Sequence, residues 1–306
     1  MKRDWPVLPP LAAWEDSRAT LHLWSQIVGK IRLGLSPWIN HSWGSALYVT
    51  SRGLTTSPMP GPGGSFTVDF DFVEHVLRVE ASDGRGRRVA LRPMSVAAFH
   101  AELFEQLGSL GIRVEILGRP VEVEEAIPFA LDETHASYDA EAVHLFWRAL
   151  VEADRVFKVF RAGFAGKASP VHFFWGAFDL ATTRFSGRPA PRHPGGAPNV
   201  ADWVMVEAYS HELASAGFWP GNGFGEAAFY AYAYPEPEGF RAHPVEPADA
   251  CFHEALGEFI LPYEAVRAAS DPDAALLAFL SSTYGAAADL ARWDRRDLEL
   301  DASRRS

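Results

Sequence analysis

The sequence contains a single cysteine, Cys251, so no disulfide can form within the chain. A chain without disulfides fits a reducing compartment, and we therefore expect a cytoplasmic protein. His253 lies two residues further on and would allow a Cys–His nucleophile pair. A free cysteine is more often a small buried hydrophobic residue, and this is the role that we expect for Cys251.

Long hydrophobic runs and an excess of positive charge are lacking too. The chain has no run of about 18 apolar residues that could span a membrane, and its N-terminus lacks the apolar segment of a signal peptide. The formal net charge is -11, whereas proteins that bind nucleic acids usually present a basic face. We therefore expect a small-molecule ligand and neither a membrane nor a nucleic acid as partner. The composition indicates no particular oligomeric state.

The established catalytic motifs are absent as well. The chain has no HExxH zinc motif and no G-x-S-x-G nucleophile elbow. The glycine-rich segment 217–225 (GFWPGNGFG) lacks the lysine of a P-loop and the spacing of a dinucleotide site, so we interpret it as a mobile lid or an aromatic wall. Any chemistry must therefore be sought in clusters of side chains.

Aromatic residues, in contrast, are abundant. The 306 residues are 48% hydrophobic and include 21 Phe and 10 Trp, which is enough to build the core of one large domain or two modest ones. Aromatic rings fill cores, and they also line the sites of small organic ligands.

Helical and strand-like patterns recur in the same order in both halves of the chain. Apolar residues at helical spacing predict helices over 16–35, 95–110, 140–164 and 271–293. Alternating or apolar runs predict strands between them, including the short segments 113–117 and 121–129. The sequence thus predicts an α+β fold with two related helix–strands–helix halves, each with an antiparallel sheet.

A weak internal repeat supports two related halves. The segment 43–52 (WGSALYVTSR) aligns without gaps on 175–184 (WGAFDLATTR). We predict an ancient duplication, with an N-terminal half over 1–135 that is the structural copy and a C-terminal half over 136–306. The C-terminal half carries an insert over 188–228, and long insertions on a scaffold are usually functional or disordered.

The second half holds the residues that suggest chemistry. Asp179 occupies the repeat position of Leu47, and the run 169–185 (SPVHFFWGAFDLATTRF) reads as one buried strand that also carries His172 and Arg184. Buried charges are costly unless they are paired. We therefore expect the site in this half, with Asp179 as a catalytic carboxylate.

The sharpest cluster is the segment 207–212 (EAYSHE). Helical or extended geometry would each place Glu207 on the same face as His211, which suits general acid–base catalysis or two ligands of a divalent metal, whereas Glu212 would point away from His211 in a strand. Glu207 or Glu212 would orient His211 or share its role. A third metal ligand would come from His172 or Asp179. Acid–base catalysis, a metal site with His211, Glu207 and His172, and purely structural hydrogen bonds stay open alternatives.

The remaining candidates would bind the substrate. Arg184 and Arg188 would anchor an anionic group. The pocket wall would be formed by the aromatic and polar side chains His172, Trp175, Trp219, Tyr232, Tyr234 and Glu236. We predict an enzyme acting on a small polar or anionic metabolite, possibly hydrolytic. The alternatives are a non-catalytic small-molecule-binding protein with an aromatic pocket and a module whose aromatic loops bind another protein.

Several segments resemble a family of bacterial proteins known only as a domain of unknown function. They include SPVHFFWGAFDLATTRFSGRPAP, EAYSHE, AGFWPG and FYAYAYPEP in the second half, and LHLWSQIVGKIRL and LYVTSRGLTTSPMP in the first. The resemblance spans nearly the whole chain. It implies one unit of conserved length and brings no activity, cofactor or catalytic residue.

Overall fold

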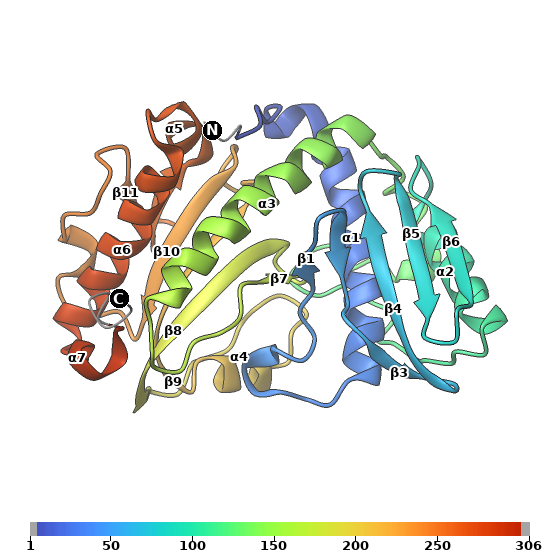
Figure 1. Ribbon diagram of the computed structural model, residues 1–306, viewed down its shortest axis with the longest axis horizontal. Helices are drawn as coiled ribbons and strands as arrows, with labels where there is room; N and C mark the ends of the chain where they lie inside the picture. Colours follow the sequence, from blue (N-terminus) through green and yellow to red (C-terminus); the bar gives the residue numbers. More distant parts are fainter. Residues whose placement is uncertain (1–4, 301–306) are drawn as a thin grey trace.

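A computed structural model describes residues 5–300 and contains two antiparallel sheets of six strands each (Figure 1). The N-terminal sheet and the C-terminal sheet lie side by side, with α3 running across β8 and α6 along β10. The predicted α+β class with antiparallel sheets is thus confirmed.

The N-terminal sheet follows α1 (Leu11–Leu35) and the short turn η1 (Asn40–Ser42). Its strands are β1 (Tyr48–Val49), β2 (Gly53–Thr55), β3 (Met59–Gly61), β4 (Gly64–Asp71), β5 (Val76–Ala81) and β6 (Gly86–Ala90), in the order β1-β2-β4-β5-β6 with β3 beside β4. Phe66, Val68 and Phe70 alternate along β4 and are buried, as expected for a strand with one face in the core and the other toward solvent. Helix α2 (Val96–Ser109) packs between α1 and β6, and η2 (Phe129–Leu131) follows it.

The C-terminal half begins with α3 (Ala140–Ala162), whose N-cap Asp139 accepts a hydrogen bond from the amide of Ala142. The strands and helices that follow are β7 (His172–Phe174), β8 (Asp179–Pro189), α4 (Asp202–Ala208), β9 (His211–Trp219), β10 (Ala228–Tyr234), η3 (Phe240–Ala242), β11 (Cys251–His253), β12 (Glu258–Pro262), α5 (Tyr263–Ala268), α6 (Pro272–Leu290) and α7 (Arg295–Leu298). The sheet order is β11-β12-β10-β9-β8-β7.

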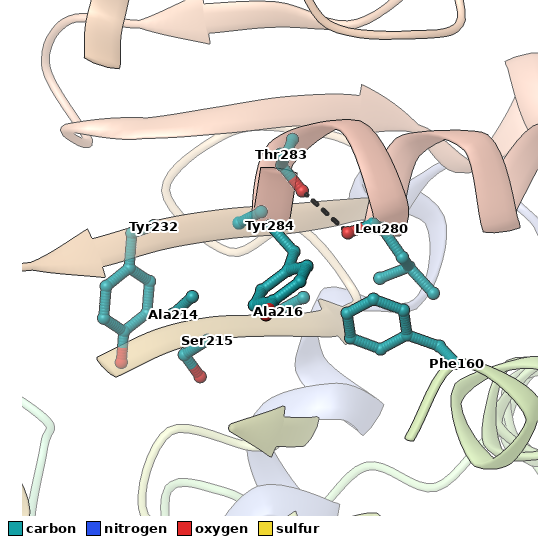
Figure 2. Close-up of a pocket in the computed structure, with 9 residues that line it drawn as sticks. Phe160, Ala214, Ser215, Ala216, Tyr232, Leu280, Thr283 and Tyr284 are labelled. Atoms are coloured by element: carbon teal, nitrogen blue, oxygen red, sulfur yellow. Dashed lines mark hydrogen bonds between the residues drawn. The ribbon is translucent and has the colours of Figure 1, made fainter. Parts of the chain in front are cut away.

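The two faces of the C-terminal sheet have different chemistry. Small and apolar side chains such as Ala214, Ala216 and Ala231 lie on the face that α3 and α6 cover. Because successive residues of a strand point to opposite faces, Ser215 and Tyr232 lie on the other face. Figure 2 shows both side chains pointing away from α6. We call this second face the open face.

The run 169–185 is not one strand, and that prediction is wrong. The chain turns after β7, and His172 pairs with Ala181 and Phe174 with Asp179 across an antiparallel hairpin. Phe178 closes the turn with a φ of 63°, a left-handed conformation that is unfavourable for a bulky side chain. Register across the hairpin places His172 and Asp179 on the same face of the sheet, and Arg184 on the other.

Two further expectations need correction. The segments 113–117 and 121–129 contain no strand. Cys251 is exposed at the edge strand β11. The segment 188–228, expected as an insert, contains α4 and all of the interior strand β9.

The two halves share one hydrophobic core that extends from Trp5 to Trp293. Leu47 and Phe173 also exchange two backbone hydrogen bonds, which join β1 of one sheet to β7 of the other. The boundaries 1–135 and 136–306 and the duplication stay predictions. Within residues 5–300, no helix has the length and apolar character needed to cross a membrane.

Candidate functional site

Tyr230 and Asp179 form the centre of a polar cluster on the open face. Tyr230 lies on β10 and Asp179 on β8, and β9 separates the two strands. The tyrosine ring crosses β9 at Gly217, where a Cβ atom would overlap the ring, and its hydroxyl donates a short hydrogen bond to Asp179 Oδ2. The missing side chain of Gly217 therefore permits this contact.

A second polar row runs parallel to the first. Thr183 Oγ1 and Ser215 Oγ are 2.9 Å apart on β8 and β9, and Tyr232 is the cross-strand neighbour of Ser215 on β10. The hydroxyls of Tyr232 and Tyr209 are 2.9 Å apart, and the rings of Tyr230 and Tyr232 stack at 6.1 Å. Tyr209 directly follows α4, which places the end of this helix over the open face.

Three carboxyl groups belong to this cluster. Burial raises the pKa of Asp179 to about 6, while the Tyr230 hydrogen bond opposes that increase. Burial and the nearby charge of Asp179 raise the pKa of Glu258 to about 7. Local desolvation and the charge of Asp179 also raise the pKa of Glu122, although this residue as a whole is exposed. Glu258 lies on β12, and Glu122 reaches the site from the loop after α2, with its carboxylate directly against Gly176. We call Glu122, Asp179, Tyr209, Tyr230, Tyr232 and Glu258 the carboxyl–tyrosine cluster.

The cluster has unused hydrogen-bonding capacity and no compensating cation. Asp179 is 6% exposed, and its Oδ1 is buried without a hydrogen-bond partner. Among residues 5–300, no lysine, arginine or histidine forms an ion pair with Glu122, Asp179 or Glu258. Asp179 is buried, Glu258 is half-buried and Glu122 is exposed. Because buried charges are normally paired, the lack of a partner is most costly at Asp179.

Aromatic rings continue on both sides of the cluster. Trp219 packs edge-on against Tyr230 at 5.7 Å and lies 6.0 Å from Phe224. At the other end, the ring of His193 stacks on Tyr209 at 4.5 Å, and Tyr234 packs edge-on against Tyr209 at 5.0 Å. The segment 217–225, interpreted above as a lid or wall, thus places aromatic rings beside the cluster.

A second group of titratable side chains lies where η1 meets α4 and β9. Lys167 Nζ is 2.7 Å from His41 Nε2, and the rings of His41 and His211 are 6.4 Å apart. Glu207 accepts hydrogen bonds of 3.0 Å from Trp38 Nε1 and acts electrostatically on His41 and Lys167. We call Lys167, His41, Glu207 and His211 the lysine–histidine cluster.

The predicted acid–base pair of histidine and glutamate takes other partners in the structure. His211 Nδ1 is 3.0 Å from Ser210 Oγ, and Glu207 is bound by Trp38 as described. Glu212 forms a 2.6 Å ion pair with Arg188, whose guanidinium also donates a hydrogen bond to the backbone oxygen of Ala291. Arg188 is thereby engaged with a carboxylate of its own chain.

Arg184 lies on the covered face, away from both clusters. Its guanidinium lies 3.5 Å from the ring centre of Phe160 and 4.3 Å from that of Tyr284, and it donates to the backbone oxygen of Phe160. Burial lowers the pKa of Arg184 to about 10. The aromatic rings around this buried cation explain how an apolar strand accommodates an arginine.

The other predicted binding residues are spread over the fold. His172 is fully buried, neither ring nitrogen has a hydrogen-bond partner, and burial lowers its pKa to about 3. Trp175 packs onto Gly29 of α1, and its Nε1 donates a 2.8 Å hydrogen bond to the backbone oxygen of Ser45. Glu236 pairs with Arg241 at 2.7 Å. Asp179, Trp219, Tyr232 and Tyr234 are the predicted residues that lie in or beside the carboxyl–tyrosine cluster.

The predicted metal ligands are not gathered at one place. His172 lies inside the hairpin of β7 and β8, whereas Glu207 and His211 belong to the lysine–histidine cluster. In the part of the chain that the structure describes, no group of three or more His, Cys, Asp or Glu side chains is arranged to hold a metal ion.

Two cavities lie next to the C-terminal sheet. The one in Figure 2 is about 10 Å³, has room for about one water molecule, and lies between β9, β10 and α6. The other is about 300 Å³ and opens at the ends of β9 and β10, where Glu212, Tyr234, Pro235 and Trp293 line it. Trp293 Nε1 is buried there without a hydrogen-bond partner.

Sequence reasoning missed Glu122, Glu258 and Lys167 as members of these clusters, whereas Asn40 and His41 were expected as a possible second site. The strand alternation of Tyr230 and Tyr232 did mark one face of β10, and Asn40–His41 precedes the first repeat segment. No local signal identifies Glu122, because its contact with Gly176 depends on the packing of a loop more than 50 residues away.

The fold and this site define an α+β protein of two antiparallel sheets, the second of which carries carboxyls and tyrosines on its open face. The profile of a family of unknown function (DUF5996) matches residues 5–300, and the chain belongs to this family. No curated protein and no solved structure matches the chain.

Proposed function

We propose that the protein binds a small organic cation at the carboxyl–tyrosine cluster. The observation that carries this proposal is the buried, unpartnered Oδ1 of Asp179 beside two further carboxyls that lack an ion-pair partner within residues 5–300. An ammonium group would neutralise these charges and donate to Asp179. The tyrosine and tryptophan rings would add cation–π attraction, worth roughly 0.5–2 kcal/mol per favourable contact.

This proposal differs in charge from the predicted anionic metabolite. The arginines that would anchor an anion are engaged elsewhere, Arg184 among aromatic rings and Arg188 with Glu212. The predicted alternative, a small-molecule-binding protein with aromatic rings around its ligand, agrees better with these contacts. A cation would also bind more tightly at pH 8 than at pH 5, because the three carboxyls ionise between these values.

The test compares choline with its uncharged isostere 3,3-dimethyl-1-butanol by titration calorimetry at pH 8. The two molecules have the same shape, so preferential binding of choline measures charge recognition alone. We expect Asp179→Asn to weaken choline binding at least about tenfold, because the ion pair between the buried carboxylate and the quaternary ammonium is lost. Asp83→Asn, at an exposed hairpin tip, is the matched control and should bind as the wild type does. Equal binding of choline and its isostere would contradict the proposal.

Acid–base catalysis at the same cluster is a second candidate. The observation that favours it is the near-neutral pKa, about 7, of Glu258, because a general acid or base works best when its pKa lies near the operating pH. The predicted hydrolase would use Glu258 and Tyr230 as proton donors. Turnover of chromogenic esters or glycosides that is lost in Glu258→Gln and kept in Asp83→Asn would support it.

A further inference from the structure

Lys167 lies in an unusual environment for a lysine. The residue precedes β7, and its backbone oxygen accepts a 3.0 Å hydrogen bond from the amide of Phe185, which fixes it beside β8. Its ammonium lies 5.4 Å from the ring centre of Trp43 and 5.1 Å from that of Phe185. Burial in these surroundings lowers the pKa of Lys167. The residue is exposed, so its amine is within reach of small molecules.

His41 is oriented to accept a proton from this amine. Its Nδ1 is 3.0 Å from the backbone oxygen of Ala208, which can only accept, so Nδ1 carries the hydrogen and Nε2 keeps its lone pair. Lys167 Nζ lies 2.7 Å from that lone pair. Burial lowers the pKa of His41, with a further contribution from Lys167, so the ring stays neutral.

The backbone at His41 and Ser42 is also strained. His41 and Ser42 both have φ values near 60°, at 61° and 60°, and left-handed conformations are costly for residues other than glycine. The imidazole packs against the rings of both Trp43 and Phe185, with ring centres 5.2 and 4.6 Å away. A nucleophile, a base and a group that orients the base are the parts from which activated nucleophiles are built.

We propose that Lys167 is a nucleophilic amine that forms a Schiff base with a small aldehyde, with His41 as the proton acceptor. In the neutral amine, the nitrogen lone pair forms a bond to the carbonyl carbon as the carbon–oxygen π bond breaks. His41 Nε2 receives the proton that the nitrogen releases and returns it to the carbonyl oxygen, which gives the neutral carbinolamine. Loss of one water molecule from the carbinolamine gives the imine, so no oxidant or reductant is needed.

The other charged groups around the amine are compatible with this chemistry. Glu207 is held by Trp38 and forms no ion pair of 4.0 Å or less with Lys167, so the amine is not tied up by a carboxylate. The ring centre of His211 is 6.4 Å from that of His41. The exposed rings of Trp38 and Trp203, 5.1 Å apart, lie beside Glu207 and offer an apolar surface for the substituent of the aldehyde.

The test uses benzaldehyde with sodium cyanoborohydride at pH 7, which reduces each imine to a stable benzylamine. The chain has four lysines, at positions 2, 30, 158 and 167, so peptide mass spectrometry assigns every adduct. We expect Lys167 to be modified several-fold faster than Nα-acetyl-lysine amide in the same solution. Lys158, exposed and paired with Asp154 at 2.5 Å, should be modified no faster than that reference.

His41→Gln keeps a hydrogen-bond acceptor beside the amine but cannot take its proton, and it should lower the rate at Lys167 to that of the reference. Lys167→Arg should remove the adduct at this position and leave the others unchanged. A wild-type Lys167 that reacts no faster than the reference overturns the proposal, whether or not either variant folds. Fast modification that persists in a folded His41→Gln variant overturns the role of His41.

Discussion

Replacing Asp179 by asparagine should make the stability of the protein less dependent on pH. Asparagine has nearly the same shape, and its side-chain oxygen can still accept the hydrogen bond from Tyr230. The substitution therefore removes the ionisable group with little change in packing. It isolates the cost of ionising one buried carboxyl.

The size of the effect follows from the pKa of Asp179. That pKa is about 6 in the folded protein and 3.8 for a free side chain, a difference of about two units or about 3 kcal/mol. Because the folded pKa is raised, the folded state binds more protons, and stability is lost as the pH rises from about 4 to about 6. About half of this loss of stability is already present at pH 5, because the carboxyl of the unfolded chain ionises at a lower pH than that of the folded protein.

Urea unfolding of the wild type and of Asp179→Asn at pH 5 and pH 8 measures this effect. We expect the advantage of the variant to grow by about 1.5 kcal/mol between the two pH values. The difference between the two proteins cancels the contributions of the titrating groups that Asp179 does not influence. Glu122 and Glu258 are exceptions, because the charge of Asp179 raises their pKa values, and losing that charge increases the advantage of the variant at pH 8. An advantage that is the same at both pH values would refute the assignment of Asp179 as a buried carboxyl that ionises near pH 6.

Two further substitutions test the same physical reasoning. Burial raises the pKa of Asp71, but hydrogen bonds from Arg52 and Arg78 and from backbone amides outweigh it and lower the pKa to about 2. Asp71→Asn should therefore cost about 2 kcal/mol at pH 7, and the cost should vanish as the pH falls from about 4 to about 2; an equal cost throughout in urea unfolding would contradict this. Gly217→Ala should displace the Tyr230 ring, lower the free energy of unfolding by about 1–3 kcal/mol and weaken choline binding. Gly285→Ala is the control, because Gly285 lies in α6 with open space around it, and this variant should be as stable as the wild type or slightly more stable.

Much of the architecture could be predicted because it depends on local patterns. Helix α3 has its cap at Asp139 and its apolar stripe within one segment, and the alternation of β4 is complete in eight residues. The turn between β7 and β8 was missed because Phe178 adopts a conformation for which its residue type gives no signal. That one turn changes which side chains share a face, and it brings Asp179 to the open face together with His172.

The sequence by itself determined the α+β class, the antiparallel sheets, the aromatic strand β10 and the presence of Asp179 in an apolar run. Only the tertiary structure decided which groups meet. Glu122 reaches the site of Asp179 through a loop, and Lys167 meets His41 across 126 residues of chain. The physical reason is that helices and strands depend on periodic patterns within a few turns of chain, whereas a site depends on contacts between segments whose distance in sequence carries no such pattern.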